Sequence, residues 1–432
     1  MLGGMIASRQ SAGAAPAWAG APRILTFTTL FPNSAAPSHG VFVENRLRHL
    51  VASGRVSARV VAPVPWFPSS APIFGRYANF AKAPRHEERF GIAIEHPRYP
   101  VLPKFGMSVA PLLLFLAALP VLRRLHAEQD FDLIDAHYFY PDGVAAAWLG
   151  QELGKPVIVT CRGNDVMLFP RYPGPRRMIL DAARRVAAIA SVSMDLKRCL
   201  CAIGVAPEQV TVLRNGVDAD FFRPVNRDVV RRALGITGRT LLSVGHLVER
   251  KGHHLAIGAL KALPEYDLVI IGERGTESGG MVNELHRQAE DPALAGRVRF
   301  IGNLPQDQLR DWYGAADALV LATNLEGMPN VMLESLACGT PVVATPVGGI
   351  PEIMTTPEAG VLMQERTAAG VVAAVEKLFS HYPDREDTRR FAETLSWDET
   401  TRGQFALFNR ALERTGRVAD PEKPVVVTET DC

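Results

Sequence analysis

The chain alternates short apolar runs with longer stretches in which apolar positions recur every three or four residues. In the first half, apolar runs predict strands at 23–28, 58–62, 133–136, 157–160, 188–191 and 210–213. Helical patterns such as 43–52 and 144–153 lie between them. Short apolar runs that alternate with helical patterns are typical of parallel βαβ units. We therefore expect a parallel sheet covered by helices.

The same pattern restarts in the second half, where strands are expected at 240–245, 266–272, 298–302, 317–322 and 340–345. The join is best placed at LRNGVDADFFRP, because Asn215-Gly216 predicts a turn and Pro224 ends the segment. We expect two doubly wound, Rossmann-like α/β domains, residues 22–215 and 216–412, with flexible tails at 1–21 and 413–432. Ligands of such sheets bind beyond the carboxyl ends of the strands, in a cleft between the domains.

Composition indicates how large the protein's cores can be and which cellular compartment it occupies. A chain of 432 residues with 47% hydrophobic content is long enough for two full cores. Its five cysteines form no CxxC motif, which argues against a disulfide framework and a zinc site and favours the reducing cytosol. The first twenty residues lack the basic and apolar regions of a signal peptide. We expect a cytoplasmic protein.

One segment raises the question of a membrane. Residues 107–125, MSVAPLLLFLAALPVLRRL, are apolar for about sixteen positions, which is short for a span, and contain Pro111 and Pro120. They predict either a buried helix or a helix lying on the bilayer surface. Residues 1–215 carry 24 basic and 14 acidic side chains, whereas 216–432 carry 23 and 31. This asymmetry favours peripheral association of the first half with an anionic membrane, although solvated surface charge explains it equally. No basic run is interleaved with aromatic residues, which argues against nucleic acid as a partner.

The candidate chemistry is concentrated in TNLEGMPNVMLESLACGTPVVAT, residues 323–345. Glu326 and Glu334 flank a turn after which a helix is expected to begin near Pro329 and end at Cys338, with Gly339 as its cap. The first amides of a helix have no partners inside it and bind phosphate oxygens well. Carboxylates on either side of such a site would accept hydrogen bonds from sugar hydroxyls. A solvated helix face with a neighbouring loop carboxylate fits the spacing as well.

A second motif, LLSVGHLVERKGHHLAI, supplies positive charge after the first strand of the second domain. Gly245 lets the backbone turn, and Arg250 and Lys251 follow on the loop. Cationic side chains here would bind phosphate oxygens and stabilise a departing nucleoside diphosphate, a task otherwise done by a metal ion. No Asp-x-Asp pair stands at a plausible position to bring Mg²⁺, so we expect neither a metal nor another cofactor.

Together these motifs resemble the retaining GT-B glycosyltransferases of family 4. The resemblance rests on the E-x7-E signature formed by Glu326 and Glu334, on VGHLVERKG and on LRNGVD, and it extends from Arg23 to about Leu412. It implies that Glu334 binds the ribose of a nucleotide sugar, Glu326 the donor sugar and Lys251 the diphosphate. It also assigns donor binding to the segment between the two glutamates: Gly327, Met328, Asn330 and Val331.

One departure from the family pattern stands in the diphosphate loop. The family commonly has arginine where this chain has His246, which puts the second diphosphate contact in doubt. Arg250 is expected to compensate. Residues 272–275 (GERG) and Asn303 follow later strands, where the base of the nucleotide would be held.

The first domain is expected to supply the other wall of the site. His137 directly follows a strand and is similar to the amino-domain histidine that the family places near the donor sugar, which implies a catalytic role. Arg162 and Asp165 would bind sugar or acceptor hydroxyls, or pair with each other. Gly40 would permit close approach of the backbone to the donor phosphate and acceptor, or serve only as a turn glycine.

The expected function is metal-independent transfer of a sugar, with retention, from a UDP- or GDP-sugar to a glycan or lipid-linked acceptor in surface polysaccharide or glycolipid synthesis. A nucleotide-sugar epimerase on the same fold is one alternative, which the E-x7-E signature disfavours. A dinucleotide oxidoreductase lacks its G-x-G-x-x-G motif here. The third alternative is a non-catalytic partner subunit that only binds the nucleotide, and His246 is the one feature in its favour.

Overall fold

The computed structural model describes residues 21–101, 106–275, 278–294 and 296–416. The predicted tails therefore lie outside the described residues, apart from Ala21 and residues 413–416.

The first sheet has eight strands in the order β10-β9-β8-β7-β1-β2-β5-β4. All neighbours pair in parallel except β4 with β5. The strands are β1 (Arg23–Phe27), β2 (Ser57–Val61), β4 (His86–Arg89), β5 (Ile92–Glu95), β7 (Leu133–His137), β8 (Val157–Cys161), β9 (Ala188–Ser191) and β10 (Val210–Val212). A separate pair is formed by β3 (Val64–Pro65) and β6 (Arg98–Tyr99).

Helices cover both faces of this sheet. Alternate residues of β1 point to opposite faces, so Leu25 and Phe27 join one core while Ile24 joins another. The helices of this part of the chain are α1 (Val41–Ala52), α2 (Arg76–Lys82), α3 (Gly106–Glu128), α4 (Val144–Leu153), α5 (Asn164–Met167), α6 (Pro173–Arg185) and α7 (Met194–Ile203). The segment 107–125, expected to be helical, lies within α3, which packs against α4.

The second sheet is fully parallel, in the order β13-β12-β11-β14-β15-β16. Its strands are β11 (Arg239–Val244), β12 (Tyr266–Ile271), β13 (Val298–Gly302), β14 (Ala318–Leu321), β15 (Val342–Ala344) and β16 (Gly360–Leu362). Its helices are α8 (Arg227–Leu234), α9 (His253–Ala259), α10 (Met281–Ala289), α11 (Gln306–Ala315), α12 (Asn330–Ala337), α13 (Ile350–Ile353), α14 (Ala368–Ser380) and α15 (Arg385–Glu393). The predicted fold class, two doubly wound α/β domains, is confirmed.

Each sheet reverses its winding at one place, and this topology positions the site. The reversal lies between β1 and β7 in the first sheet and between β11 and β14 in the second. Crevices outside the carboxyl ends of strands at such reversals are where ligands bind in doubly wound folds. The residues predicted from sequence follow these four strands: Gly40 after β1, His137 at the end of β7, Lys251 after β11 and Glu326 after β14.

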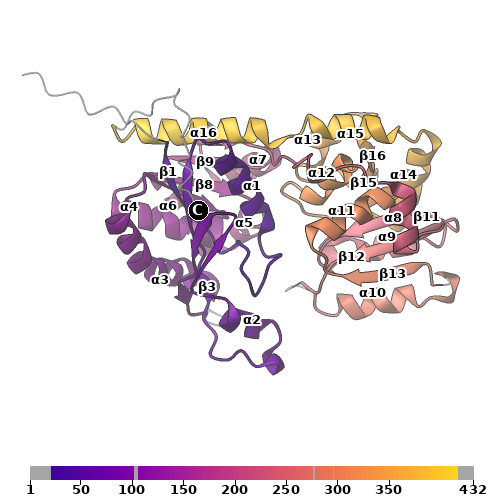
Figure 1. The fold of residues 1–432 in the computed structure, drawn as a ribbon, viewed down its shortest axis with the longest axis horizontal. Helices are drawn as coiled ribbons and strands as arrows, with labels where there is room; N and C mark the ends of the chain where they lie inside the picture. Colours follow the sequence, from indigo (N-terminus) through magenta and orange to yellow (C-terminus); the bar gives the residue numbers. More distant parts are fainter. Residues whose placement is uncertain (1–20, 102–105, 276–277, 295, 417–432) are drawn as a thin grey trace, which may run out of the picture.

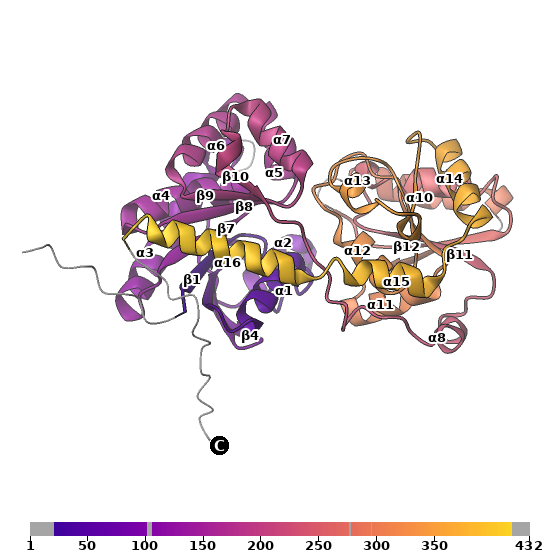
Figure 2. The same cartoon turned by 90° about the horizontal axis from the view of Figure 1, so that it is seen from above.

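Two segments connect the domains side by side. Residues 213–226 lead from β10 to α8, and α16 (Trp397–Glu413) returns to the first domain (Figures 1 and 2). Leu407, Phe408 and Leu412 of α16 are buried in the core that includes β2 and α1. The range 216–412 expected for the second domain therefore contains a helix that packs with the first.

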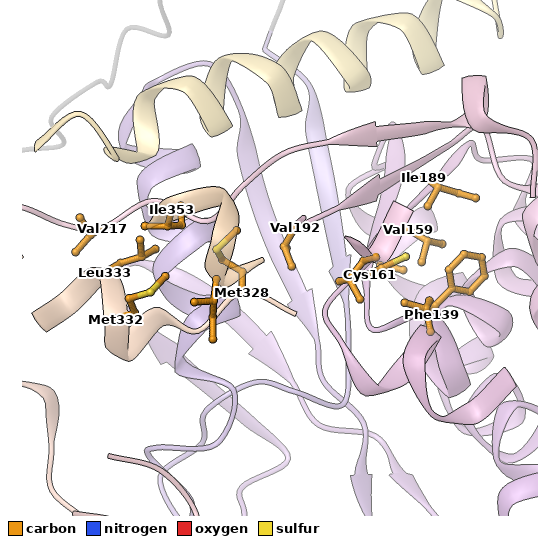
Figure 3. Packing of buried hydrophobic residues seen from close by; sticks show 14 of the residues in the cluster. Phe139, Val159, Cys161, Ile189, Val192, Val217, Met328, Met332, Leu333 and Ile353 are labelled. Carbon is orange, nitrogen blue, oxygen red and sulfur yellow. The ribbon is translucent and has the colours of Figure 1, made fainter. Parts of the chain in front are cut away.

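The buried core is continuous from one domain to the other. Val192 and Cys161 of the first domain belong to the same apolar cluster as Met328, Met332 and Ile353 of the second. Figure 3 shows Met328 reaching toward Val192 from the loop before α12. The loop that carries the predicted donor contacts is thus anchored at the junction of the domains.

Candidate functional site

The loop after β14 and the start of α12 form the centre of the candidate site. Pro329 is the N-cap residue, in an extended conformation, and the helix begins at Asn330, one residue later than expected. The helix ends with Cys338 as C-cap, and Gly339 follows with a φ of 75°, as expected for a terminating glycine. The start of α12 follows the carboxyl end of β14, the strand that neighbours β11.

Glu334 lies inside α12 and is only 8% exposed. Its Oε2 accepts a hydrogen bond of 2.8 Å from the hydroxyl of Tyr313, a fully buried residue of α11. Burial raises the pKa of Glu334 to about 7, while the hydrogen bonds from Tyr313 and Gln306 act in the opposite direction. Glu334 is therefore a buried carboxyl poised to titrate near neutral pH, and not a residue of a solvated helix face.

Glu326 and Lys251 form an ion pair across the two loops. Thr323 Oγ1 also donates to Glu326 Oε1 over 3.2 Å. The backbone carbonyl of Arg250 accepts from the amide of Asn324 at 2.9 Å, so the loop after β11 is bound directly to the loop after β14. The structure thus brings together the lysine and the glutamate that the sequence predicted on separate motifs.

Two glycines permit the backbone path of the loop between β11 and α9. A Cβ on Gly252, whose φ is 75°, would stand 1.9 Å from the carbonyl oxygen of Ala322. Gly245, with a φ of 147°, lies against the methylene groups of Lys251. The lysine stem is therefore held over the end of β11 and its ammonium group is directed at Glu326.

His246 lies beside the loop that follows β12. Burial lowers the pKa of His246. A Cβ added to Gly275 would stand 3.2 Å from the Cβ of His246. Its carbonyl oxygen lies 3.2 Å from Nε2 of His253, a buried histidine whose Nδ1 lies 2.8 Å from Ser243 Oγ. Residues 272–275 are thus placed against the diphosphate loop. Asn303, also expected near the base of the nucleotide, donates a hydrogen bond of 3.1 Å to the hydroxyl of Ser38 in the first domain.

In the first domain, His137 is fully buried, and both of its ring nitrogens have hydrogen-bond partners. Nε2 lies 3.1 Å from the Asp135 carboxylate, and Nδ1 lies 2.7 Å from Nη2 of Arg162. An arginine only donates and a carboxylate accepts, so the ring is neutral, with its proton on Nε2. Burial lowers the pKa of His137 to about 4, consistent with the neutral form.

Arg162 connects the first domain to α12. Its Nη1 donates to Asn215 Oδ1 over 3.1 Å, and Asn215 Nδ2 donates to Asn330 Oδ1 over 2.8 Å. Its guanidinium lies 5.4 Å from the centroid of the Phe42 ring. Burial lowers the pKa of Arg162 to about 9. A row of hydrogen bonds therefore runs from His137 to the first residue of α12.

Asp165 is placed differently from the sequence expectation. Its buried carboxylate accepts hydrogen bonds from the backbone amides of Phe139 at 2.7 Å, Arg162 at 3.1 Å and Gly163 at 2.6 Å. It binds the backbone of Arg162, so the alternative to sugar binding, a side-chain pair between the two residues, is not the contact observed. Asp165 therefore holds the loop that presents Arg162.

Gly40 and Gly327 each permit a close approach of backbone. A Cβ on Gly40, whose φ is 72°, would stand 2.3 Å from the carbonyl of Leu30. A Cβ on Gly327 would stand 2.1 Å from the carbonyl oxygen of Arg162. The first glycine shapes the loop after β1, while the second lets the loop before α12 touch the opposite domain.

Sequence reasoning missed several residues that hold this site: Tyr313, Asp135, Gln404 and Asp142. Gln404 of α16 donates to Asp135 at 2.8 Å, and Asp142 accepts from the Thr29 amide at 2.7 Å. Tyr313, Gln404 and Asp142 carry no motif, because each acts through a partner distant in sequence, whereas Asp135 binds His137 two residues further on. Among the described residues, no group of three or more His, Cys, Asp or Glu side chains could hold a metal ion.

Comparisons with known proteins identify the family. The family model of glycosyl transferases group 1 matches residues 226–394, and that of glycosyltransferase family 4 matches residues 77–221. TuaC of Bacillus subtilis, a glycosyltransferase assigned to teichuronic acid biosynthesis, is 27% identical over 82% of this chain and 88% of its own. The D-inositol 3-phosphate glycosyltransferase of Acidothermus cellulolyticus is 29% identical over 72% of this chain and 74% of its own.

Solved structures give the same fold at lower identity. The sucrose-phosphate synthase of Thermosynechococcus elongatus matches with a TM-score of 0.73 at 17% identity, covering 91% of this chain and all of the other. HepE of Anabaena, determined with UDP, matches with a TM-score of 0.68 at 19% identity, covering 89% and 98%. With both halves of the chain matched by models of one group of enzymes, the protein belongs to the GT-B glycosyltransferases of family 4.

Proposed function

We propose that the protein transfers a sugar, with retention of anomeric configuration, from a UDP- or GDP-sugar to a glycan or lipid-linked acceptor in surface polysaccharide or glycolipid synthesis. The observation that carries the proposal is the meeting of Lys251 and Glu326 beside the first turn of α12, where the second sheet reverses its winding. Anion-binding amides, a cation and two carboxylates are then available to one nucleotide sugar.

The donor is proposed to bind with its diphosphate between the α12 amides and Lys251, and with its ribose hydroxyls on Glu334. Asn330 and Val331 supply those amides, and Gly327 and Met328 line the turn before them. Glu326 would then exchange part of its contact with Lys251 for hydroxyls of the donor sugar. HepE of Anabaena, which has this fold, has been determined with UDP-glucose.

In the proposed step, the acceptor oxygen bonds to the anomeric carbon as the bond from that carbon to the diphosphate breaks. The acceptor proton passes to the departing phosphate oxygen, so that charge and atoms balance. The protein positions the reactants and stabilises negative charge on the leaving group. Lys251 does this directly, with Arg250 beside it, and Arg162 faces the reaction from the first domain.

The test supplies labelled UDP-sugars and GDP-sugars together with a bacterial glycan or lipid extract, in the presence of a chelator. The expected result is label in a glycan or lipid product, with the transferred sugar showing the anomeric coupling of its donor by NMR. Product of inverted configuration would overturn retention. Interconversion of the donor sugar without an acceptor would replace transfer by epimerisation.

A further inference from the structure

Helix α3 presents an unusual face to solvent. From Gly106 to Leu122 it contains no charged residue, yet Leu112 and Leu116, one turn apart, are 46% and 55% exposed. It is the one helix of the described chain that is long and apolar enough to cross a membrane, and only 22% of its apolar window is buried. A helix at a water-facing surface normally carries polar residues on its outer side.

This helix does not leave the domain to span a bilayer. Its inner face, with Leu114, Ala118 and Leu122, is completely buried in the core beneath the first sheet. Extracting it would expose that core. The outer face is therefore available only for contact along the surface.

A second apolar group lies on the segment that contains α2. Trp66 is 58% exposed and Ile73 is 87% exposed, and Phe74 and Tyr77 are also exposed. The rings of Phe74 and Tyr77 both pack on Phe67, with centroids 5.3 and 5.6 Å away. The aromatic side chains are thus ordered by one another while their outer surfaces remain open to solvent.

The two groups adjoin through the small sheet of β3 and β6. The amide of Trp66 donates to the carbonyl oxygen of Tyr99 at the end of β6 over 2.7 Å, and β6 contacts α3. Figure 1 shows α2, β3 and α3 at the lower side of the first domain, opposite α16. We call the combined apolar area the docking surface: Trp66, Ile73, Phe74, Tyr77, Leu112 and Leu116.

Three arginines lie on elements that adjoin α3 and its neighbours. Arg171, Arg176 and Arg177 are exposed, and among the described residues none of the three has an ion-pair partner. The turn of Arg171 lies near the start of α3, since the Tyr140 hydroxyl donates to the carbonyl of Met107 and the Tyr140 ring packs on Phe169. Helix α6, which carries Arg176 and Arg177, contacts α3. Exposed aromatic side chains with arginines on neighbouring elements match the headgroup region of an anionic bilayer.

We propose that the docking surface binds the first domain to a bilayer containing anionic phospholipid, with its aromatic side chains at the depth of the headgroups. This inference extends the part of the proposed function in which the acceptor is lipid-linked. It rests on the proposed function only for the identity of the acceptor. Apolar burial supplies affinity, while the arginines select negative charge and make binding sensitive to salt.

The first test is cosedimentation with vesicles of phosphatidylcholine alone or mixed with phosphatidylglycerol. The parent is expected to bind the mixed vesicles and to lose binding in high salt. The double variant Trp66→Ser, Phe74→Ser should bind about tenfold or more weakly, because two apolar anchors are removed. Arg176→Glu with Arg177→Glu should lose the preference for phosphatidylglycerol. Val229→Ser, which alters a residue 51% exposed on α8 of the second domain, is the matched control and should bind like the parent.

Thermal stabilisation by UDP or GDP is measured on every variant and is expected to equal that of the parent. This separates loss of docking from loss of the fold or of the donor site. The proposal is overturned if the parent does not bind vesicles that contain phosphatidylglycerol, or if the Trp66 and Phe74 variant binds them as tightly as the parent. A dimer of the parent in solution that dissociates in this variant would assign the surface to a second copy of the chain instead.

Discussion

Nη2 of Arg162 donates a hydrogen bond of 2.7 Å to Nδ1 of His137, and the other ring nitrogen of His137 is bound to Asp135. With both nitrogens occupied, His137 reaches the reacting centre through Arg162. We therefore propose that it is a positioning residue, whereas the family resemblance implied a catalytic role near the donor sugar. Its neutral form is essential, because an imidazolium would offer Arg162 no acceptor.

Replacing His137 by alanine is expected to lower kcat by about tenfold or more while leaving the nucleotide affinity close to that of the parent. His137→Asn keeps an acceptor near the position of Nδ1, so it should restore a part of kcat. Steady-state kinetics with titration of UDP separate the two effects. Equal loss in both variants would show that the imidazole itself acts on the substrate.

The raised pKa of Glu334, about 7, predicts how nucleotide affinity depends on pH. Only the ionised carboxylate accepts hydrogen bonds from both ribose hydroxyls. Affinity for the cognate nucleoside diphosphate should therefore increase as pH rises from 6 to 8, whereas Glu334→Gln should bind weakly and keep only the pH dependence of the phosphate. Calorimetric titration of both proteins measures the difference.

Tyr313→Phe gives a graded form of the same test. The hydroxyl of Tyr313 stabilises the ionised form of Glu334, so its removal should raise the pKa of Glu334 further. The increase in affinity should then occur at higher pH than in the parent. An unchanged pH profile would mean that Glu334 is not the group that titrates.

Burial of Glu334 also predicts a pH dependence of stability. Its pKa in the folded protein lies above the unfolded value of 4.5, so the fold binds the proton more tightly than the unfolded chain does. This contribution is fully present below 4.5 and is lost as pH rises to about 7. The unfolding free energy of the parent should therefore fall more across this interval than that of Glu334→Gln, as measured by urea denaturation. A steeper fall in the variant would contradict the assignment.

Lys251→Met is expected to lower kcat by about 10²–10³-fold, because the departing diphosphate loses its principal cation. Glu326, which pairs with Lys251, would also be left without its partner. Lys261→Met, on an exposed lysine that pairs with Asp291 in the same domain, is the control and should behave like the parent. Full turnover in Lys251→Met would exclude the proposed diphosphate contact.

Gly327→Ala tests the approach of the domains. The added methyl carbon would meet the carbonyl oxygen of Arg162 at 2.1 Å, so the donor loop and the first domain must separate. Turnover should fall while the second domain still binds nucleotide, and small-angle scattering should give a larger radius of gyration. Gly280→Ala, where a Cβ would meet nothing within 4 Å, should change neither property.

The parts of the site that the sequence predicted are those carried by short segments. A helix start after a strand, with Glu326 and Glu334 around it, is visible because its residues are adjacent in the chain. The apolar segment 107–125 is predicted to form either a buried helix or a helix on the bilayer surface; α3 has one face in the core and the other exposed, and its contact with a membrane stays a prediction.

The remaining contacts depend on residues brought together only by the fold. Tyr313 and Glu334 lie on different helices, and Gln404 reaches Asp135 from a helix that crosses between the domains. The return of α16 to the first domain was missed for the same reason, because its apolar pattern fits either core. His137 was expected directly after its strand and is the last residue of β7, but the contact at its Nδ1 depends on Arg162, 25 positions further along the chain.

The central claim, that Glu334 and the start of α12 bind a nucleoside diphosphate, is tested most directly by thermal unfolding of the parent and of Glu334→Ala with UDP, GDP, ADP, dTDP and NAD. A ligand that binds the native state raises its stability by mass action. The account predicts stabilisation of the parent by UDP or GDP and its loss in the variant. Equal stabilisation of both proteins would contradict the ribose assignment, and stabilisation by none of the five ligands would contradict the donor site itself.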